Sequence, residues 1–285
     1  MNLTPEQEQT LAEIKVERIK DVHETIIKTI RGAVIEGKEN KLASLFKRKK
    51  NLLDDQKDIL ASYVVLTPAD EVLAFFSLRC GELFKRVDLK KMEVCQRAWD
   101  SFEKLYNTPT LSPAERNSCI DDIREARNVG VNTPDEIRAY ALKNQKYQRD
   151  KKKWSYGNIE QVSDVFPAVE LTYLGINEKG KSLWNSYNMP QRLGETMFWY
   201  VVMQKIESVC SLVGCQYVYL FAADKEPDGD LVNYYQTRLH FAANTDLNAN
   251  KPHFDLNCRF MYQDIETLKK YKDYFFDHFD SVSSK

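Results

Sequence analysis

From residue 166 onward, stretches with the composition of β-strands alternate with stretches of helical periodicity. Strands separated by helices are typical of α/β proteins, in which the connecting helices cover a sheet. In such folds ligands gather where strands end and helices begin, here around Gly175, Gly194 and Asp224. The predicted strands are AVELTYLGI (168–176), CQYVYLFAA (215–223) and FDLNCRFMYQDI (254–265), and the predicted helices between them begin near residues 191 and 230.

The first 84 residues carry a second set of predicted elements. IKVERI (14–19) predicts a strand, and VHETIIKTIRGAVIEG (22–37) and KLASLFKRKKNLLDDQKDIL (41–60) predict helices. YVVLTPADEVLAFFSL (63–78) has two β-rich runs on either side of a TPAD turn and predicts a hairpin.

Residues 85–160 differ from both flanks because β-type runs are missing there. Three helical stretches fill the segment, and the last begins with TPDE at 133–136, a sequence typical of a helix start. We therefore expect a helical insertion over 85–160, between the third and fourth strands of one domain that spans residues 1–285.

Composition and charge narrow the function classes. The 41 Lys+Arg and 42 Asp+Glu residues leave a net charge of -1, so no overall field attracts nucleic acid or an anionic membrane. The charged N-terminal segment and the lack of a long apolar run predict a soluble, cytoplasmic protein with no membrane partner. Six dispersed cysteines without a CxxC pair, and only four histidines, predict reduced thiols and no metal site.

The glycine at position 194 stands where a polar loop, predicted over 177–190, enters a long apolar helix. The first four amides of a helix have no partner within it, and with the helix dipole they favour an anion. A glycine there leaves room for a phosphate, although on local grounds such a glycine is more often a packing residue or part of a loop. Neither a P-loop Gly-Lys-Ser/Thr nor a GxGxxG fingerprint is present.

The order of motifs resembles a known superfamily. A strand, then Gln191-x-x-Gly194-x-Thr196, a long apolar helix, the strand YVYLFAAD and a helix with Tyr234-Tyr235 that closes on Phe241 resemble the second half of GNAT acyl-CoA-dependent N-acyltransferases. The family motif reads Gln/Arg-x-x-Gly-x-Gly/Ala, and its later tyrosine precedes a Gly-Phe pair. Thr196 replaces the last small residue, and His240 stands where the family has glycine. The resemblance is strongest over 166–264 and implies a GNAT-like central mixed, splayed β-sheet flanked by helices.

The resemblance also implies where acetyl-CoA, the donor cosubstrate, would bind. In the family the strand before the phosphate motif splays from its neighbour, and pantetheine pairs with its exposed backbone. The helix amides receive the pyrophosphate. The matching positions are Leu174, Gly175 and Ile176 for the backbone, and Gln191, Arg192, Leu193, Gly194, Glu195 and Thr196 for the phosphate motif. Separately from the family motif, Asn233 stands just before the tyrosines and is expected either to cap their helix or to bind the pantetheine arm.

Acyl transfer to an amine needs a free amine, a proton acceptor and an acid for the leaving thiolate. A phenol suits the last role because its pKa near about 10 keeps it protonated at neutral pH. Tyr235 is the first candidate and Tyr234 the second, with core packing as the alternative for both. Glu170 is the candidate base, or a salt-bridged strand carboxylate. His240 and His253 are interpreted as structural residues.

These features predict an N-acetyltransferase in which an amine attacks acetyl-CoA directly. The alternative is a catalytically inactive GNAT-fold protein that binds acyl-CoA or a partner, and nucleic-acid binding ranks last. The basic runs 46–50 and 149–153 are solvated faces, or they grip the 3′-phosphate of CoA or an acidic acceptor. The amine acceptor cannot be identified from the sequence, and the protein is expected to act as a monomer or homodimer.

Overall fold

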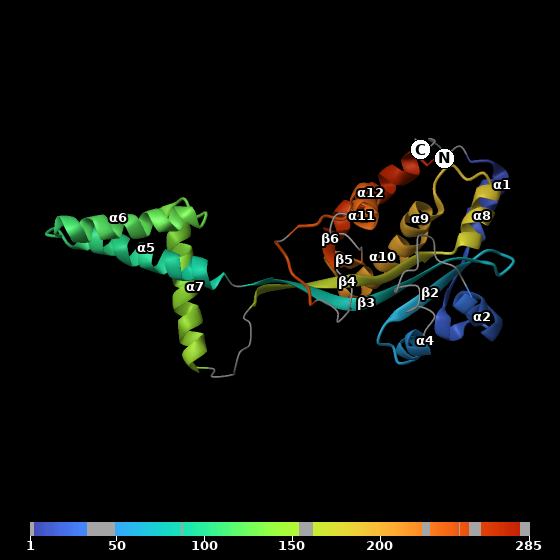
Figure 1. Cartoon of the computed structure of the whole chain (residues 1–285), viewed down its shortest axis with the longest axis horizontal. Coiled ribbons are helices and arrows are strands. Elements are labelled where there is room, and N and C mark those ends of the chain that lie inside the picture. The colour runs from blue at the N-terminus through green and yellow to red at the C-terminus, as the bar shows by residue number, and fades with distance from the viewer. Residues whose placement is uncertain are drawn as a thin grey trace. The chain divides into compact units, whose positions relative to one another are not determined.

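The computed structural model describes residues 3–32, 49–86, 88–153, 162–223, 229–244, 246–250 and 258–279. The chain divides into two compact units (Figure 1). One unit combines Met1–Phe84 with Val165–Lys285, and the other is Lys85–Asp164. We call them the sheet unit and the helical unit.

A mixed six-stranded sheet forms the centre of the sheet unit, with the strands in sequential order. β1 pairs with β2, β2 with β3, and β5 with β6 in antiparallel fashion, whereas β4 and β5 are parallel. The TPAD turn closes the β2–β3 hairpin, where the Thr67 amide donates to the Glu71 carbonyl at 2.9 Å. The mixed α/β class and the hairpin predicted from the sequence are therefore confirmed. The strands are β1 (Lys15–Arg18), β2 (Ala61–Leu66), β3 (Val72–Arg86), β4 (Val162–Ile176), β5 (Tyr217–Ala223) and β6 (Cys258–Asp264).

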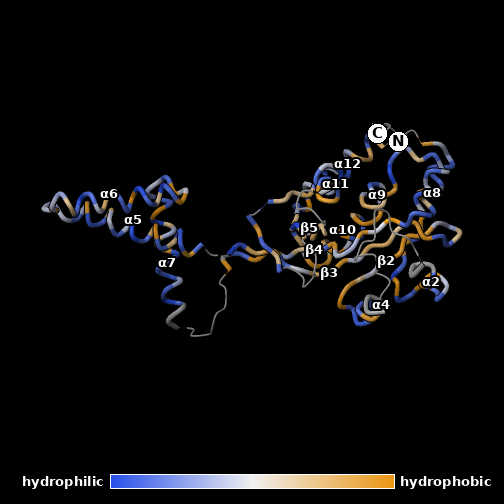
Figure 2. The backbone as a smooth tube through the Cα atoms, viewed as in Figure 1, coloured by the Kyte–Doolittle hydropathy of each residue, from blue (hydrophilic) through white to orange (hydrophobic). Residues whose placement is uncertain are grey.

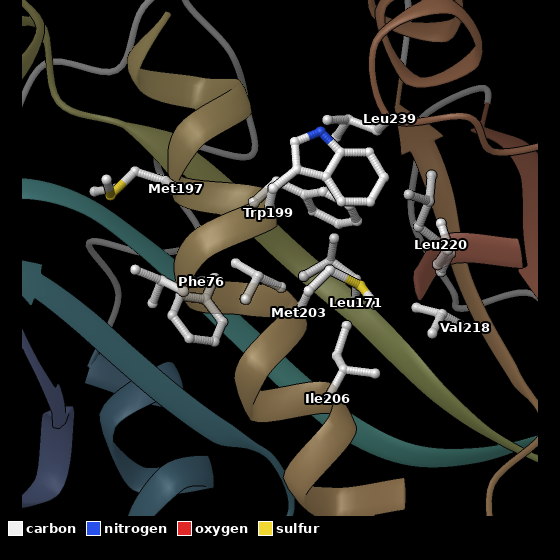
Figure 3. Close-up of a cluster of buried hydrophobic side chains, with 14 of the residues drawn as sticks. Phe76, Leu171, Met197, Trp199, Met203, Ile206, Val218, Leu220 and Leu239 are labelled. Atoms are coloured by element: carbon white, nitrogen blue, oxygen red, sulfur yellow. The ribbon is translucent and has the colours of Figure 1, made fainter. Parts of the chain in front are cut away.

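One face of the sheet carries the main hydrophobic core. A continuous helical segment lies across it, composed of α9 (Leu193–Thr196), a π-helical stretch (Met197–Val202) and α10 (Met203–Val213). Figure 3 shows Met197, Trp199 and Ile206 of this segment packed with strand residues such as Leu171 and Val218. The segment ends at Gly214, whose left-handed backbone (φ 70°) is the usual helix terminator. The helices α1 (Pro5–Ala12), α8 (Glu178–Ser186), α11 (Asp230–Thr237) and α12 (Ile265–Asp277) add residues to the same core.

The opposite face is covered near β2 by α2 (Glu24–Gly32), α4 (Lys49–Gln56) and the short 3-10 turn Ile19–Asp21. Asp55, which is fully buried, ties α4 to two strands. Its carboxylate accepts hydrogen bonds from the Arg18 guanidinium and from the amides of Lys20 and Ser62. Both carboxylate oxygens of Asp55 thereby accept hydrogen bonds, which offsets the cost of burying its charge.

One prediction about the sheet unit is wrong. Residues 177–190 do not form a loop throughout, because α8 occupies Glu178–Ser186. A Cβ at Gly180 would lie 2.7 Å from the Leu73 Cα, so this glycine lets the helix approach the backbone of β3, while Trp184 fills the core. No prediction covers α12, which follows β6 directly and packs through Leu268. Residues 254–257 of the predicted final strand lie outside the described residues.

The helical unit consists of α5 (Leu89–Asn107), α6 (Pro113–Asn128) and α7 (Pro134–Lys153), inserted between β3 and β4 as predicted. Its own core includes Cys95, Ala126 and Ile137. Reciprocal hydrogen bonds between Thr133 and Glu136 confirm the helix start expected at the TPDE sequence. In Figure 2 most of α6 has the colours of hydrophilic residues, whereas β2 and β4 of the sheet unit are largely hydrophobic.

Several global properties follow from the described residues. None of their helices is long and apolar enough to cross a membrane. All six cysteines are free thiols, as predicted. Within the same residues, no group of three or more histidine, cysteine or carboxylate side chains is arranged to hold a metal ion.

Candidate functional site

The parallel strands β4 and β5 are paired over three residues only. Ala168 pairs with Tyr217, Val169 with Val218, and Glu170 with Tyr219. β4 then continues to Ile176 and β5 to Ala223, and over these described residues no further β4–β5 pairing is present. Unpaired strand backbone offers amide and carbonyl groups to an extended ligand. The residues proposed for pantetheine, Leu174, Gly175 and Ile176, all lie on this unpaired part of β4.

The side-chain alternation of β4 changes phase at Thr172. Val169 and Leu171 face the main core, and so do Leu174 and Ile176, whereas Tyr173 packs on the opposite face. An uninterrupted two-residue alternation along AVELTYLGI predicts Tyr173 on the same face as Leu171, and the structure shows that this prediction is wrong. Such irregularities bend a strand and are common beside active sites. The phase change brings Gly175 under the Phe75 ring, where a Cβ would lie 2.6 Å from the Phe75 Cε2.

Three elements converge on Gly194. A Cβ added there would lie 2.8 Å from the Tyr234 hydroxyl of α11 and 3.6 Å from the Ile176 Cγ1 of β4. Arg192 is the N-cap residue, and no side chain caps this helix in the described part of the chain. The structure thus brings together the strand end, the helix start and a tyrosine, which are the three parts singled out from the sequence.

The two adjacent tyrosines have different surroundings. Tyr235 is 8% exposed, and its ring packs against Phe241 in the main core. Burial raises the pKa of Tyr235 to about 12. Burial also raises the pKa of Tyr234, and the nearby Glu195 carboxylate raises it further. Both phenols are therefore protonated at neutral pH, but the hydroxyl beside the helix start belongs to Tyr234.

Glu195 is a buried carboxylate in the first turn of the helix. The residue is 4% exposed, and its Oε1 atom accepts no hydrogen bond among the described residues. The nearest cation is the Arg238 guanidinium, whose Nε lies 3.8 Å from Oε1. Burial raises the pKa of Glu195, although the charges of Arg238 and Arg192 oppose this. A carboxylate in this position is costly in its charged form.

We expect Glu195→Gln to raise the melting temperature at pH 7.5 and to leave it unchanged near pH 4. The pKa of Glu195 is raised above its ordinary value of 4.5, so the folded state holds the proton more tightly than the unfolded chain does. Folding stability is therefore lost as the pH rises above that ordinary value, and glutamine does not ionise. Thermal melts at the two pH values measure the effect. Glu178→Gln, at an exposed glutamate, is the control, and a lower melting temperature for Glu195→Gln at pH 7.5 would contradict the prediction.

Other residues of the proposed cofactor site have structural contacts. The Gln191 side chain donates to the Phe279 carbonyl at 3.0 Å. The backbone carbonyl of Gln191 accepts from the buried Trp184 indole at 2.9 Å. Leu193 is buried in the main core, and the Thr196 hydroxyl donates to the Arg192 carbonyl at 3.1 Å. Asn233 is exposed inside α11, which begins after Gly229, so its predicted role as a helix cap is wrong.

Glu170, the residue proposed as base, is held on the far side of the sheet from Gly194. It is 2% exposed. Its Oε2 atom accepts from the Arg79 Nε at 3.0 Å and from the Tyr219 hydroxyl at 3.1 Å. Sequence reasoning did not single out Arg79, Tyr219 or Arg238, because their partners come from other strands and helices.

The position after α11 explains a departure from the family motif. His240 has a left-handed backbone (φ 57°), a conformation that favours glycine, which the family motif has there. The His240 ring stacks on Tyr271 with centroids 3.6 Å apart, and burial lowers the pKa of His240. This packing agrees with the structural role predicted for His240. His253 and residues 46–48 of the first basic run lie outside the described residues.

Comparison with known proteins gives distant likenesses only. No protein-family model matches the chain, and no curated protein matches it. A tyrosine-to-phenylalanine mutant of the AtaT toxin is 12% identical with a TM-score of 0.47, covering 91% of this chain and 93% of that chain. AtaTR bound with acetyl-CoA is 13% identical with a TM-score of 0.45, covering 91% and 98%. A tyrosine-to-phenylalanine mutant of KacT is 14% identical with a TM-score of 0.44, covering 91% and 99%.

These toxins have the GNAT fold. With TM-scores of 0.44–0.47, their likeness to this chain supports no statement about its substrate. The fold class rests on the chain's own features, which are the mixed sheet, the separation of β4 from β5 and the uncapped helix that follows β4 and α8. The chain therefore has a mixed α/β fold, with a six-stranded sheet flanked by helices, a short β4–β5 pairing and a helical insertion between its third and fourth strands.

Proposed function

We propose that the protein is an N-acetyltransferase that binds acetyl-CoA between the unpaired end of β4 and the start of α9. The observation that carries this proposal is the meeting of Ile176, Gly194 and Tyr234. A strand end that is not paired with β5, a helix N-terminus without a side-chain cap and a protonated phenol are the groups that would suit an acyl-CoA thioester.

The residues present fit such a ligand. The amides from Leu193 to Glu195 start a helical segment whose dipole favours a pyrophosphate, and Gly194 adds no side chain to their surface. The Thr196 amide, also proposed for the phosphate, instead donates to the Arg192 carbonyl at 3.0 Å. Arg192, exposed at the N-cap, and Arg238, partly exposed on α11, supply positive charge beside the same turn. The charged form of Glu195 opposes this positive charge, so protonation of Glu195 favours the binding of an anion.

In the proposed reaction, acetyl-CoA supplies an acetyl group activated as a thioester. An unprotonated amine forms the new N–C bond while the C–S bond breaks. Tyr234 donates its phenolic proton to the departing sulfur, because burial keeps that phenol protonated at neutral pH. Tyr235 remains the second candidate for this acid. The proton released by the amine passes to solvent.

Acetyl-CoA is expected to stabilise the protein. At a concentration 100 times its Kd, a ligand that binds only the folded state adds about 2.7 kcal/mol to the free energy of unfolding. A thermal shift with acetyl-CoA and with CoA, and with ATP as the matched control, measures this effect. No shift at millimolar acetyl-CoA would contradict the proposed cofactor.

The thermal shift and an assay for released CoA thiol together separate the proposal from its alternative. A binding protein without turnover would show the thermal shift but would release no CoA thiol in the presence of small amines, polyamines, peptide amino termini or lysine. Acetyl-dependent release of CoA thiol with any of these amines would favour the enzyme.

A further inference from the structure

Side chains from three neighbouring strands meet on the sheet face opposite the main core. Arg79 comes from β3, Glu170 from β4 and Tyr219 from β5. The Glu170 Oε2 atom accepts from both the Arg79 guanidinium and the Tyr219 hydroxyl, at 3.0 and 3.1 Å. Glu170 and Tyr219 are 2% and 4% exposed, so the hydrogen bond between them is shielded from water, whereas the Arg79 side chain is 39% exposed. Buried polar groups satisfied in this way specify one strand arrangement.

The position of this cluster in the sheet gives it a particular meaning. Glu170 and Tyr219 form the last residue pair between β4 and β5. Two residues further on, at Thr172, the alternation of β4 changes phase. Tyr219 can cross toward Glu170 because Gly81 of β3 leaves space for its hydroxyl, which a Cβ at Gly81 would overlap.

We propose that Arg79, Glu170 and Tyr219 form a clasp that fixes the point where β4 leaves β5. The clasp thereby positions the unpaired backbone of Leu174–Ile176 for the acyl donor. Glu170 is then a positioning residue and not the base of the reaction. The statement about the donor rests on the proposed function, whereas the statement about strand separation stands on the geometry alone.

The clasp explains why a buried carboxylate lies on this face of the sheet at the last β4–β5 pair. Parallel pairing would otherwise continue along both strands, because each has further residues in extended conformation. Two hydrogen bonds to one carboxylate oxygen draw β3 and β5 toward β4 before the phase change, and the phase change then turns β4 away from the next pairing position. An arginine–carboxylate pair is directional enough to hold such a register.

Tyr219→Phe and Glu170→Gln in the full chain test the inference, with Tyr217→Phe as a matched control on the same strand. The first readout is amide hydrogen exchange of residues 171–176. Both test variants are expected to exchange at least about 10-fold faster there than the control. Unchanged exchange in both variants would overturn the clasp, whether or not the protein binds CoA.

The second readout separates positioning from base catalysis. Both test variants are expected to raise the Kd for CoA and the KM for acetyl-CoA about 10-fold, with kcat at saturation and its pH profile preserved. Tyr219→Phe is informative here because it removes a clasp hydrogen bond without removing a carboxylate. A kcat that falls more than about 100-fold in Glu170→Gln alone, with loss of the acidic limb of the pH profile, would overturn the positioning role. If the unaltered protein binds no CoA, the proposed function fails, and the exchange result still decides the clasp.

Discussion

Tyr234→Phe is expected to lower kcat for acetyl transfer by about 10²–10⁴-fold, the usual contribution of a positioned general acid. The substitution removes only the hydroxyl that approaches Gly194. The ring keeps its edge-to-face contact with Tyr235, at a centroid distance of 5.8 Å, so the local packing is preserved. The Kd for acetyl-CoA should therefore change little, and the loss should lie in kcat and in kcat/KM alike.

Tyr235→Phe is the matched control for this prediction. Its ring lies in the main core against Phe241, and adjacent residues of a helix point about 100° apart. We expect a change in kcat of less than about 10-fold, with Kd and melting temperature close to those of the unaltered protein. The reverse result, with the large loss in Tyr235→Phe, would transfer the acid role to Tyr235. Small losses in both variants would mean that neither phenol assists the departing thiolate.

Gly194→Val is expected to weaken acetyl-CoA binding by about 100-fold, equivalent to about 2.7 kcal/mol. Even the Cβ atom would lie 2.8 Å from the Tyr234 hydroxyl, and the branched side chain would cover the helix amides proposed to hold the pyrophosphate. Isothermal titration with acetyl-CoA gives the Kd directly. Unchanged binding would show that Gly194 serves only the approach of Tyr234 and receives no phosphate.

A pair of smaller substitutions separates these two roles of Gly194. Gly194→Ala alone should displace the Tyr234 hydroxyl and lower kcat. In the double variant Gly194→Ala/Tyr234→Phe the nearest ring atom, Cζ, is 3.8 Å from the new Cβ, which is an ordinary contact. Its melting temperature should therefore exceed that of Gly194→Ala. Absence of this rescue would contradict the close approach of the two residues.

The sequence was informative wherever local pattern and local structure coincide. The hairpin around TPAD, the helix that starts with Leu193 and the capping pair Thr133 and Glu136 depend on neighbouring residues, so they could be predicted. Local pattern failed at α8, where the polar sequence suggested a loop. That helix is stabilised by Trp184 in the core and by the contact of Gly180 with β3, neither of which a sequence window contains.

The candidate site divides in the same way. Gly194, Tyr234 and the strand ending at Ile176 could be selected from residue type, spacing and a family resemblance. Which tyrosine lies beside Gly194 depends on how α11 packs on the main core, and the surroundings of Glu170 depend on β3 and β5. The sequence by itself determined the order of the strands, the helical insertion and the local signals from glycines, helix caps and turns. Only the tertiary structure decided the β4–β5 separation, the Arg79–Glu170–Tyr219 cluster and the burial of Glu195, because each arises from contacts between residues far apart in the chain.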